Sequence, residues 1–458
     1  MKDASKSPLP EGEGTSRGIL ISLILIFLLR LALALNLPLH FDEAYYWLWS
    51  QNLAPGYYDH PPMVALLIRL STILFGGGEF GVRFLSVLLG IPVTWALWRT
   101  AEILFDDAKI AARAALYFNL TLLATVCTVI VTPDSPLLLA TTLTIYSAAQ
   151  LWKTQNPRWW LAIGAAVGFG LVSKYTAFFT GFSILAWLCA DPKMRRWLFT
   201  PWPCAAGALS LLIFSPVLLW NYHHDYVSFA KQFGRAAPHG LTLSYEGEYL
   251  GALIGLLTPP IFILGLRGKN PLLLSFILPL AVYFAWHALH ARVQANWILP
   301  IFPPFAIAAA ACVSTSRGAA FSRRIAVPFA AIVLLLAAAL TLHPPSALKE
   351  KLAYGWNDLG PQIEKLRKDS GASAILTSSY ANAGWLSFYV PNTQTIPVGD
   401  PVRWENFSPP DPAQLHEKLL YVADDKHDFA QTLPRQAILL ATLPRGTEQI
   451  RVYLVAAR

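Results

Sequence analysis

A succession of long apolar runs constrains the fold of this chain more than any other feature. The first run covers about residues 18–35, and eleven more follow at about 61–75, 80–98, 111–131, 135–152, 159–172, 175–190, 204–220, 249–266, 271–287, 297–313 and 325–342. A helix needs about 20 apolar residues to cross a bilayer. Only 14% of the residues are charged, whereas soluble domains carry about 25%. The sequence therefore predicts an α-helical multi-pass membrane protein and excludes a soluble enzyme.

Polar composition marks three regions. Residues 1–17 form a polar tail, 18–343 hold the apolar runs with a first outer loop at 38–61, and 344–458 have ordinary soluble character. The last region contains a predicted helix at about Leu359–Lys368, capped by Asn357 or Asp358. Its strand-like runs are Ala374–Ser379, Leu386–Val390, Leu419–Ala423, Ala437–Leu443 and Ile450–Ala456. We expect a small α/β domain packed over an outer cavity.

The basic residues predict the sides of the membrane. The net charge of +8 arises from 35 Lys+Arg and 27 Asp+Glu. The cations form short clusters between apolar runs rather than one stripe, which favours membrane lipids over nucleic acid as partners. The positive-inside rule assigns to the cytoplasm the loops with Lys153/Arg158, Lys193/Arg195/Arg196, Arg267/Lys269 and Arg317/Arg323/Arg324. The alternate loops and the C-terminal domain then lie outside.

The number of crossings is not settled by the runs alone. A cytoplasmic amino terminus and an outer C-terminal domain require an odd number, but the runs number twelve. The run at 61–75 is short for a crossing. We expect about 11–13 transmembrane helices, with 61–115 as the region that is miscounted.

The acids of the outer loops are the first candidates for chemistry. Asp42 and Glu43 begin a predicted amphipathic helix with aromatic anchors in the membrane interface, Asp59 precedes two prolines, and Asp134 lies in the segment TPDSP. Asp42, Asp59 and Asp134 are each also explained as a helix cap, a role worth about 0.5–2 kcal/mol. Capping does not explain why all lie on one side. Carboxylates beside a bilayer are costly unless solvated or used, which indicates a cavity.

Outer cations and amides are candidates for binding. Lys174 faces outward against the positive-inside preference, so it is either a snorkelling lysine or a contact for an anionic substrate. Arg292, Gln294 and Asn296 lie in another outer loop. They either bind phosphate or sugar hydroxyls or belong to a hydrated loop anchored by Trp297.

Five segments together resemble the bacterial branch of glycosyltransferase family 39, the dolichyl-phosphate-mannose–protein mannosyltransferases, with their lipid A aminoarabinose transferase relatives. They are DEAYYWLWSQ at 42–51, GYYDHPP at 56–62, TPDSP at 132–136, SKYT at 173–176 and VQANW at 293–297. The resemblance implies a GT-C fold in a bacterial inner membrane. It also implies a polyprenyl-phosphate-linked sugar donor and inverting transfer on the extracytoplasmic side to a protein, lipid A or another glycan.

The resemblance also suggests roles for residues. Asp42 matches the acid thought to act as base or to contact the acceptor, while Glu43, Asp59 and Asp134 would orient substrates or hold a divalent cation. His60, Lys174, Tyr175, Arg292, Gln294 and Asn296 would contact the sugar or phosphate. The lipid A transferases carry a lysine where this chain has His60, which weakens the aminoarabinose reaction specifically. A phosphate leaving group needs no general acid, so no cofactor is required, although a divalent cation is compatible. Whether a hexose or a pentose is transferred stays open, and a secondary transporter or a non-catalytic component of polysaccharide assembly are the alternatives.

Overall fold

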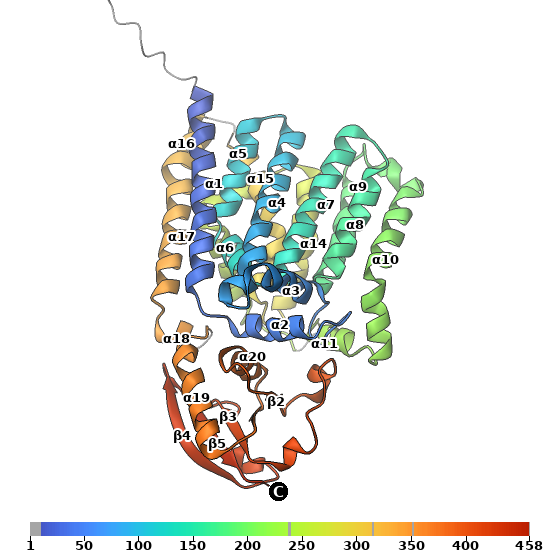
Figure 1. The fold of residues 1–458 in the computed structure, drawn as a ribbon. Helices are drawn as coiled ribbons and strands as arrows, with labels where there is room; N and C mark the ends of the chain where they lie inside the picture. The colour runs from blue at the N-terminus through green and yellow to red at the C-terminus, as the bar shows by residue number, and fades with distance from the viewer. Residues whose placement is uncertain (1–10, 237–239, 314–315, 350–351, 458) are drawn as a thin grey trace, which may run out of the picture.

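The computed structural model describes residues 11–236, 240–313, 316–349 and 352–457, and most of them are helical. A bundle of helices carries an α/β domain at one end (Figure 1). The first helices are α1 (Glu11–Asn36), α2 (Phe41–Gln51), α3 (Met63–Phe75), α4 (Glu79–Phe105), α5 (Ala108–Leu120), α6 (Leu122–Val129), α7 (Asp134–Thr154), α8 (Trp159–Leu171) and α9 (Phe178–Ala190). The bundle continues with α10 (Trp202–His223), α11 (Val227–Ala236), α12 (Glu246–Leu257), α13 (Pro259–Gly265), α14 (Pro271–Ala288), α15 (Phe302–Ala311), α16 (Ser316–Phe321) and α17 (Val327–Leu342). The predicted fold class is confirmed.

Helix length and composition identify the membrane spans. Among the described residues, five helical stretches are long and apolar enough to cross a bilayer, and seven if the bent pairs α5–α6 and α12–α13 each count as one span. Large apolar side chains such as Ile24 of α1, Leu212 of α10 and Leu335 of α17 are exposed on the outside of the bundle. Lipid, rather than water, is the solvent that such outer faces require.

Helix α3 carries the short apolar run at 61–75, in the region where the sequence left the number of crossings open. Its 13 residues extend about 20 Å, well short of the bilayer core of about 30 Å. It lies beside α2 at the end of the bundle nearest the C-terminal domain (Figure 1), with Leu66, Leu70 and Ile73 exposed. Helix α8 is also 13 residues long, so it is the place of α3 at the end of the bundle, and not its length alone, that sets the run at 61–75 apart.

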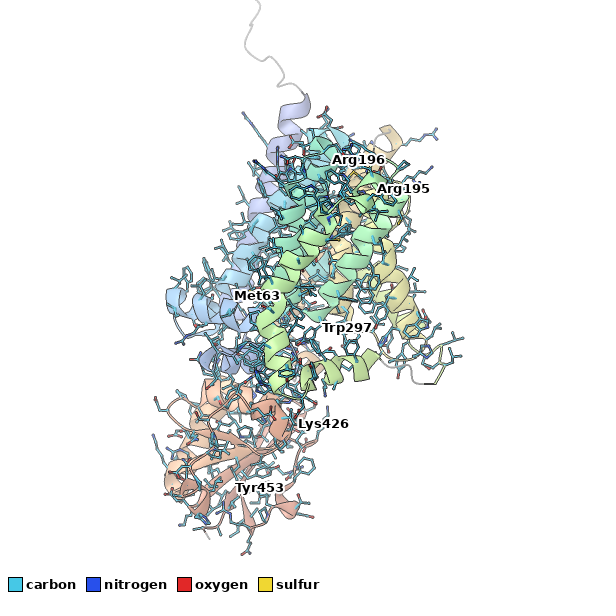
Figure 2. The ribbon with its side chains drawn as sticks, turned by 90° about the vertical axis from the view of Figure 1, so that its right-hand side faces the viewer. Met63, Arg195, Arg196, Trp297, Lys426 and Tyr453 are labelled. Atoms are coloured by element: carbon cyan, nitrogen blue, oxygen red, sulfur yellow. The ribbon has the colours of Figure 1, made fainter. Side chains whose placement is uncertain are left out.

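One of the clusters that the sequence assigns to the cytoplasm can be placed in the bundle. Arg195 and Arg196 lie at the end opposite the C-terminal domain, which carries Lys426 and Tyr453 (Figure 2). The candidate acids instead lie at the end next to that domain. We call this the cavity end.

Arg30 of α1 is buried inside the bundle and has a structural role. Its guanidinium donates to Asn119 Oδ1 at 2.8 Å, to the Asn119 carbonyl at 3.2 Å and to Thr125 Oγ1 at 3.2 Å. The chain bends by 66° between α5 and α6 at this place, which leaves carbonyls at the end of α5 without helical partners. Arg30 satisfies one of them and so stabilises the bend.

The C-terminal domain is built on a five-stranded sheet with the order β2-β1-β3-β5-β4. Strands β2, β1 and β3 are parallel, whereas β5 pairs antiparallel with β3 and β4. The strands are β1 (Ala374–Thr377), β2 (Thr395–Pro397), β3 (Leu419–Ala423), β4 (Ala437–Arg445) and β5 (Glu448–Val455), and the helices are α18 (Ser346–Lys349), α19 (Trp356–Ser370) and α20 (Tyr380–Tyr389).

Two details of this domain differ from the prediction. The expected strand Leu386–Val390 lies mostly in α20, because Ser379 caps a helix and its buried face packs on α2. The predicted helix starts earlier, and Gly355 in the left-handed conformation, rather than Asn357 or Asp358, occupies its N-cap. Short apolar runs fit strand and helix equally well, so tertiary contacts decide between them.

Helix α2 is enclosed between the bundle and α20. Tyr45 and Trp49 were expected as anchors in the membrane interface, but they are buried in one core with Trp385 and Leu386 of the C-terminal domain. A Cβ atom at Gly384 would lie 2.8 Å from the backbone of Ala44 and Tyr45. Only glycine permits this close approach of the two helices, and the C-terminal domain therefore forms one wall of the cavity end.

Candidate active site

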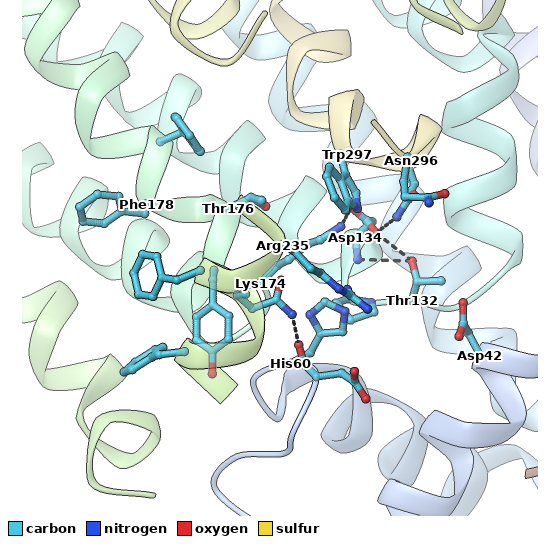
Figure 3. Close-up of a pocket in the computed structure, with 18 of the residues that line it drawn as sticks. Asp42, His60, Thr132, Asp134, Lys174, Thr176, Phe178, Arg235, Asn296 and Trp297 are labelled. Carbon is cyan, nitrogen blue, oxygen red and sulfur yellow. Dashed lines mark hydrogen bonds and ion pairs between the residues drawn. The ribbon is translucent and has the colours of Figure 1, made fainter. Parts of the chain in front are cut away.

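A cavity of about 1110 Å³ opens at the junction of the bundle and the C-terminal domain. Its polar wall contains Asp42, Asp59, Asp134, His60, Lys174 and Arg235, and its apolar wall contains Phe178, Phe179, Phe182, Phe214, Phe229 and Phe233. Figure 3 shows Asp42, His60, Lys174 and Asp134 around one space with Phe178 at its far side. Three of the four predicted acids therefore share one site, as the sequence predicts.

The alternative explanation of these acids as helix caps does not hold. His40 caps α2, since its Nδ1 accepts from the Asp42 backbone N–H at 3.2 Å and its own N–H donates to Glu43 Oε2 at 2.8 Å. The N-cap positions of α3 and α7 are Pro62 and Pro133, with no side-chain cap. The carboxylates of Asp42, Asp59 and Asp134 are therefore available for other contacts.

Asp42 is the uncommitted acid of the cavity. In the part of the chain that the structure describes, it forms no ion pair with a lysine or arginine; His40 Nδ1 lies at 3.7 Å and the Tyr380 hydroxyl at 3.5 Å. Its side chain is 32% exposed, toward the cavity. Poor hydration, and next the neighbouring Asp59 carboxylate, raise the pKa of Asp42 to about 7. A carboxylate with such a pKa suits a general base near neutral pH.

Asp134 and Lys174 form a buried ion pair. Lys174 Nζ lies 2.7 Å from Asp134 Oδ1, and Asn296 Nδ2 donates to Asp134 Oδ2 at 2.7 Å. Thr132 Oγ1 adds a longer contact to Asp134 at 3.4 Å. Lys174 is therefore neutralised by Asp134. The pair joins α7 to the segment after α8, and Asn296 adds the segment before α15 to the same wall.

Asp59 has a cationic partner that the sequence did not reveal. Arg403, in the segment Pro401–Trp404 of the C-terminal domain, forms an ion pair with Asp59 Oδ2. The Tyr45 hydroxyl donates to the same oxygen at 3.1 Å. Arg403 lies more than 340 residues from Asp59 in sequence, so no local pattern could pair them.

Glu43 lies outside the cavity wall and is fully buried. Arg83 of α4 pairs with both of its oxygens, and the Val131 N–H donates to Glu43 Oε1 at 3.0 Å. Arg83 also donates to the Pro38 carbonyl at 2.8 Å. Because each oxygen already accepts from several donors, Glu43 fixes α2 against the bundle. Sequence spacing alone could not separate it from its neighbour Asp42.

Arg235 and His60 are the cavity groups best placed for an anionic ligand. Figure 3 shows Arg235 of α11 reaching into the cavity near Lys174 and Asp134. No ion pair of Arg235 is found among the described residues. His60 Nδ1 is buried with no hydrogen-bond partner in the same part of the chain. Burial, together with Lys174 and Arg235, lowers the pKa of His60 far below its usual value, so its ring is neutral.

The sequence contains a signal for Arg235 in the side of the membrane on which it lies. It lies in an outer-loop segment, 227–236, where apolar residues recur at helical spacing. The argument from the positive-inside rule that selected Lys174 applies equally to Arg235.

The remaining predicted residues lie around the cavity wall. Tyr175 lines it and shares a 2.8 Å hydrogen bond with Ser228. Gln294 also lines it. Arg292 lines its rim and pairs with Glu248 at 2.7 Å, with both side chains at least half exposed. Arg292 is therefore the least enclosed of the candidate binding residues.

The donor set for a metal ion is sparse. Across the described residues, no group of three or more His, Cys, Asp or Glu side chains is arranged to hold one. Asp59 and Asp134 are each engaged by a cation, which leaves the Asp42 carboxylate. These contacts do not fit a divalent-cation site of the kind that clustered carboxylates form.

Comparison with known structures identifies the fold. ArnT from Cupriavidus metallidurans, solved with bound undecaprenyl phosphate, superposes with a TM-score of 0.70 at 14% identity, covering 95% of this chain and 98% of ArnT. This chain has the GT-C fold. An oligosaccharyltransferase from Archaeoglobus fulgidus shares it more distantly, with a TM-score of 0.53 at 13% identity over 87% of this chain and 67% of that one.

Sequence comparison finds similarity to the mannosyltransferases of family 39 and to a lipid A glycosyltransferase. Residues 59–220 of this GT-C protein match the family model for dolichyl-phosphate-mannose-protein mannosyltransferase. The lipid A galacturonosyltransferase RgtD of Rhizobium johnstonii is 26% identical over 279 residues, which cover 57% of this chain and 58% of RgtD. The match thus spans little more than half the length of that relative. The resemblance recognised in the sequence is confirmed.

Proposed function

We propose that this chain is an inverting glycosyltransferase that moves a sugar from a polyprenyl-phosphate donor to an acceptor, with Asp42 as the general base. One observation carries the proposal. Among the described residues, Asp42 is the cavity aspartate that forms no ion pair with a lysine or arginine, and it lies where two cavities meet. The relationship to family 39 supports the reaction type. Glu43, Asp59 and Asp134 act in this proposal by holding the site in shape.

The large cavity suits the donor. Its volume of about 1110 Å³ lies above the range of about 300–1,000 Å³ for drug-sized ligands. Its apolar wall includes Phe178 and Phe182, both exposed at the outside of the bundle, and so offers a polyprenyl tail a path from the bilayer. We propose that the phosphate and sugar lie against its polar wall, which includes Arg235, His60 and the Lys174–Asp134 pair.

The chemistry follows from this placement. Asp42 accepts the proton of the acceptor hydroxyl or amine as the acceptor atom forms its bond to the anomeric carbon, opposite the breaking bond to the phosphate oxygen. The polyprenyl phosphate leaves as an anion and needs no proton. Arg235 stabilises the charge that develops on it, since a fixed cation beside the leaving phosphate favours the transition state.

A second cavity favours an acceptor with an apolar part. It measures about 440 Å³, lies between α1, α6 and α17, and shares Asp42, Thr132 and Asn296 with the first. Its wall is mainly apolar and includes Leu33, Leu37, Leu122, Val126, Val129, Ile130 and Leu334. We propose that a lipid acceptor such as lipid A occupies it and presents its hydroxyl or amine to Asp42. A protein or a soluble glycan is the outcome that would contradict this choice.

We place the reaction on the extracytoplasmic face of a bacterial inner membrane. The loop with Arg195 and Arg196 lies opposite the cavity end (Figure 2), and the positive-inside rule assigns it to the cytoplasm. A secondary transporter would hold its ionisable residues near mid-membrane, whereas Asp42, Asp59 and Asp134 lie at one end of the bundle. A measurement of turnover distinguishes a transferase from a non-catalytic component.

Turnover is tested with membranes from cells that express the chain and from cells that lack it. Both are given a polyprenyl-phosphate sugar labelled in the sugar, and lipid, protein and glycan fractions are examined by mass spectrometry. We expect label in the lipid fraction with expression only. Equal label in both membranes would contradict a transferase, and label in the protein fraction would contradict the lipid acceptor alone.

Arg235→Ala tests the contact with the donor phosphate. We expect kcat/KM for the donor to fall about 10- to 100-fold, because a hydrogen bond to a charged group contributes about 1.5–3 kcal/mol. Lys231→Ala is the matched control, since Lys231 lies on the same helix but packs over Tyr58, with Nζ 5.0 Å from the ring centroid. A fall of equal size in both variants would indicate a general effect on α11 instead.

Removal of divalent cations tests the metal. We propose that transfer needs none, because Asp59 and Asp134 are already neutralised by Arg403 and Lys174. The initial rate of purified protein is expected to stay the same after dialysis against EDTA. A rate that collapses in EDTA and returns with Mg²⁺ or Mn²⁺ would contradict this.

A further inference from the structure

The C-terminal domain contributes side chains to the wall of the transfer site. Arg403 and Tyr380 both line the main cavity, although each belongs to the domain that follows the membrane bundle. Arg403 is 9% exposed and is enclosed by three aromatic rings. Its guanidinium lies 4.6 Å from the Tyr380 ring centroid, 5.2 Å from Tyr58 and 5.4 Å from Tyr45.

Arg403 is held in place by its own segment. It lies in the 3-10 turn Pro401–Trp404, where Asp400 is 3.6 Å from its Nε. Trp404 Nε1 donates to the Gly399 carbonyl at 2.9 Å, and its ring packs edge-on against Tyr45 at 5.7 Å. The neighbouring Asn406 donates to the Gly56 carbonyl at 2.8 Å. This turn is therefore fixed to the first loop of the bundle at several points.

The contacts of Arg403 connect it to the base through Asp59. Arg403 pairs with the Asp59 carboxylate and donates to the Tyr45 hydroxyl at 3.2 Å. The groups that face Asp42 from the surrounding elements are His40, Glu43, Tyr46, Asp59, Arg235 and Tyr380. Asp59 is the nearby anion with the largest effect on Asp42, and Arg403 is the cation that compensates it.

We propose that Arg403 is a positioning residue of the transfer reaction, so that the site is complete only when the C-terminal domain is docked on α2. The inference rests on the proposed function and adds a role for the domain. Arg403 fixes the Asp59 loop and neutralises the anion beside the base. It acts through Asp59 and does not transfer the proton itself.

The kinetic test compares the pH dependence of kcat in Arg403→Ala, Arg403→Lys and the parent. Without Arg403 the uncompensated Asp59 anion disfavours ionisation of Asp42. We therefore expect the acid limb of Arg403→Ala to move to higher pH by roughly half to one unit, and Arg403→Lys to restore most of the shift. Adding Asp59→Asn to Arg403→Ala should remove the shift. An Arg403→Ala protein with lower kcat and an unmoved limb would overturn the proposal.

A second readout does not depend on activity. Amide hydrogen exchange of residues 52–62 is expected to become faster in Arg403→Ala, to recover in Arg403→Lys and to stay at the parent rate in Arg451→Ala. The last variant breaks the pairs of Arg451 with Asp425 and Asp428, away from the cavity. Unchanged exchange in Arg403→Ala would overturn the positioning role even if the parent shows no transfer, whereas faster exchange with an inactive parent would contradict only the proposed function.

Discussion

Replacing Asp42 by asparagine is expected to lower kcat by about 10²- to 10⁴-fold, the contribution typical of a general base. The amide keeps the size of the side chain but cannot accept the proton of the acceptor. Since Asp42 forms no ion pair with a lysine or arginine among the described residues, its loss leaves no buried cation uncompensated, and the protein should fold normally. Steady-state kinetics with a labelled donor, at equal amounts of folded protein, measure the effect.

The pH dependence of the parent checks the same assignment. The pKa of Asp42 is raised to about 7, so the base loses its charge as the pH falls through this value. We expect kcat to be constant above about pH 8 and to fall roughly tenfold per unit below pH 6. An unperturbed aspartate would give a limb near pH 4. A limb at pH 4 in the parent, or an Asp42→Asn variant as fast as the parent, would contradict the role of Asp42.

Replacing the adjacent Glu43 by glutamine is expected to lower the stability of the protein strongly. Both side chains of the Glu43–Arg83 pair have no exposed area, and breaking a buried ion pair by removal of one partner costs about 3–5 kcal/mol. The charge of Arg83 would remain buried beside a neutral amide. We expect a markedly lower midpoint of thermal unfolding in detergent, measured by intrinsic fluorescence.

The double variant Glu43→Gln/Arg83→Met supplies the control. It removes the second charge as well, so the midpoint should return part of the way toward that of the parent. The folded fraction of Glu43→Gln should retain much of the parent's turnover, since Glu43 does not line the cavity. A Glu43→Gln protein with parental stability and no turnover would instead make Glu43 a catalytic residue.

Much of the bundle could be predicted because helices that cross a bilayer must consist mainly of apolar residues. Apolar runs marked the helices, and the clustered arginines marked the end opposite the C-terminal domain. The short run at 61–75 was ambiguous, since apolarity alone does not show that α3 lies at one end of the bundle. Strand periodicity likewise identified Leu419–Ala423, but the run at Leu386–Val390 became helical against α2.

The sequence could predict those site residues that are charged and lie in outer loops, where such charges are not expected. Asp42, Asp59, Asp134 and Lys174 were selected in this way and share one cavity. Arg403 was not, because its role depends on how the C-terminal domain docks, and neither sequence spacing nor side of the membrane reports that contact. Glu43 was grouped with Asp42 because the sequence does not show which of two adjacent helix residues faces the cavity. The packing of the helix decides this.

The central claim is that the protein transfers the sugar of a polyprenyl-phosphate donor in the cavity that Asp42 lines. Its most direct measurement uses purified protein in liposomes with a doubly labelled donor, and follows release of polyprenyl phosphate and appearance of the sugar on an added lipid acceptor. We predict that both products form together with the parent and that both nearly vanish with Asp42→Asn. Equal product with the parent and with Asp42→Asn, or none with the parent across lipid, protein and glycan acceptors, would contradict the claim.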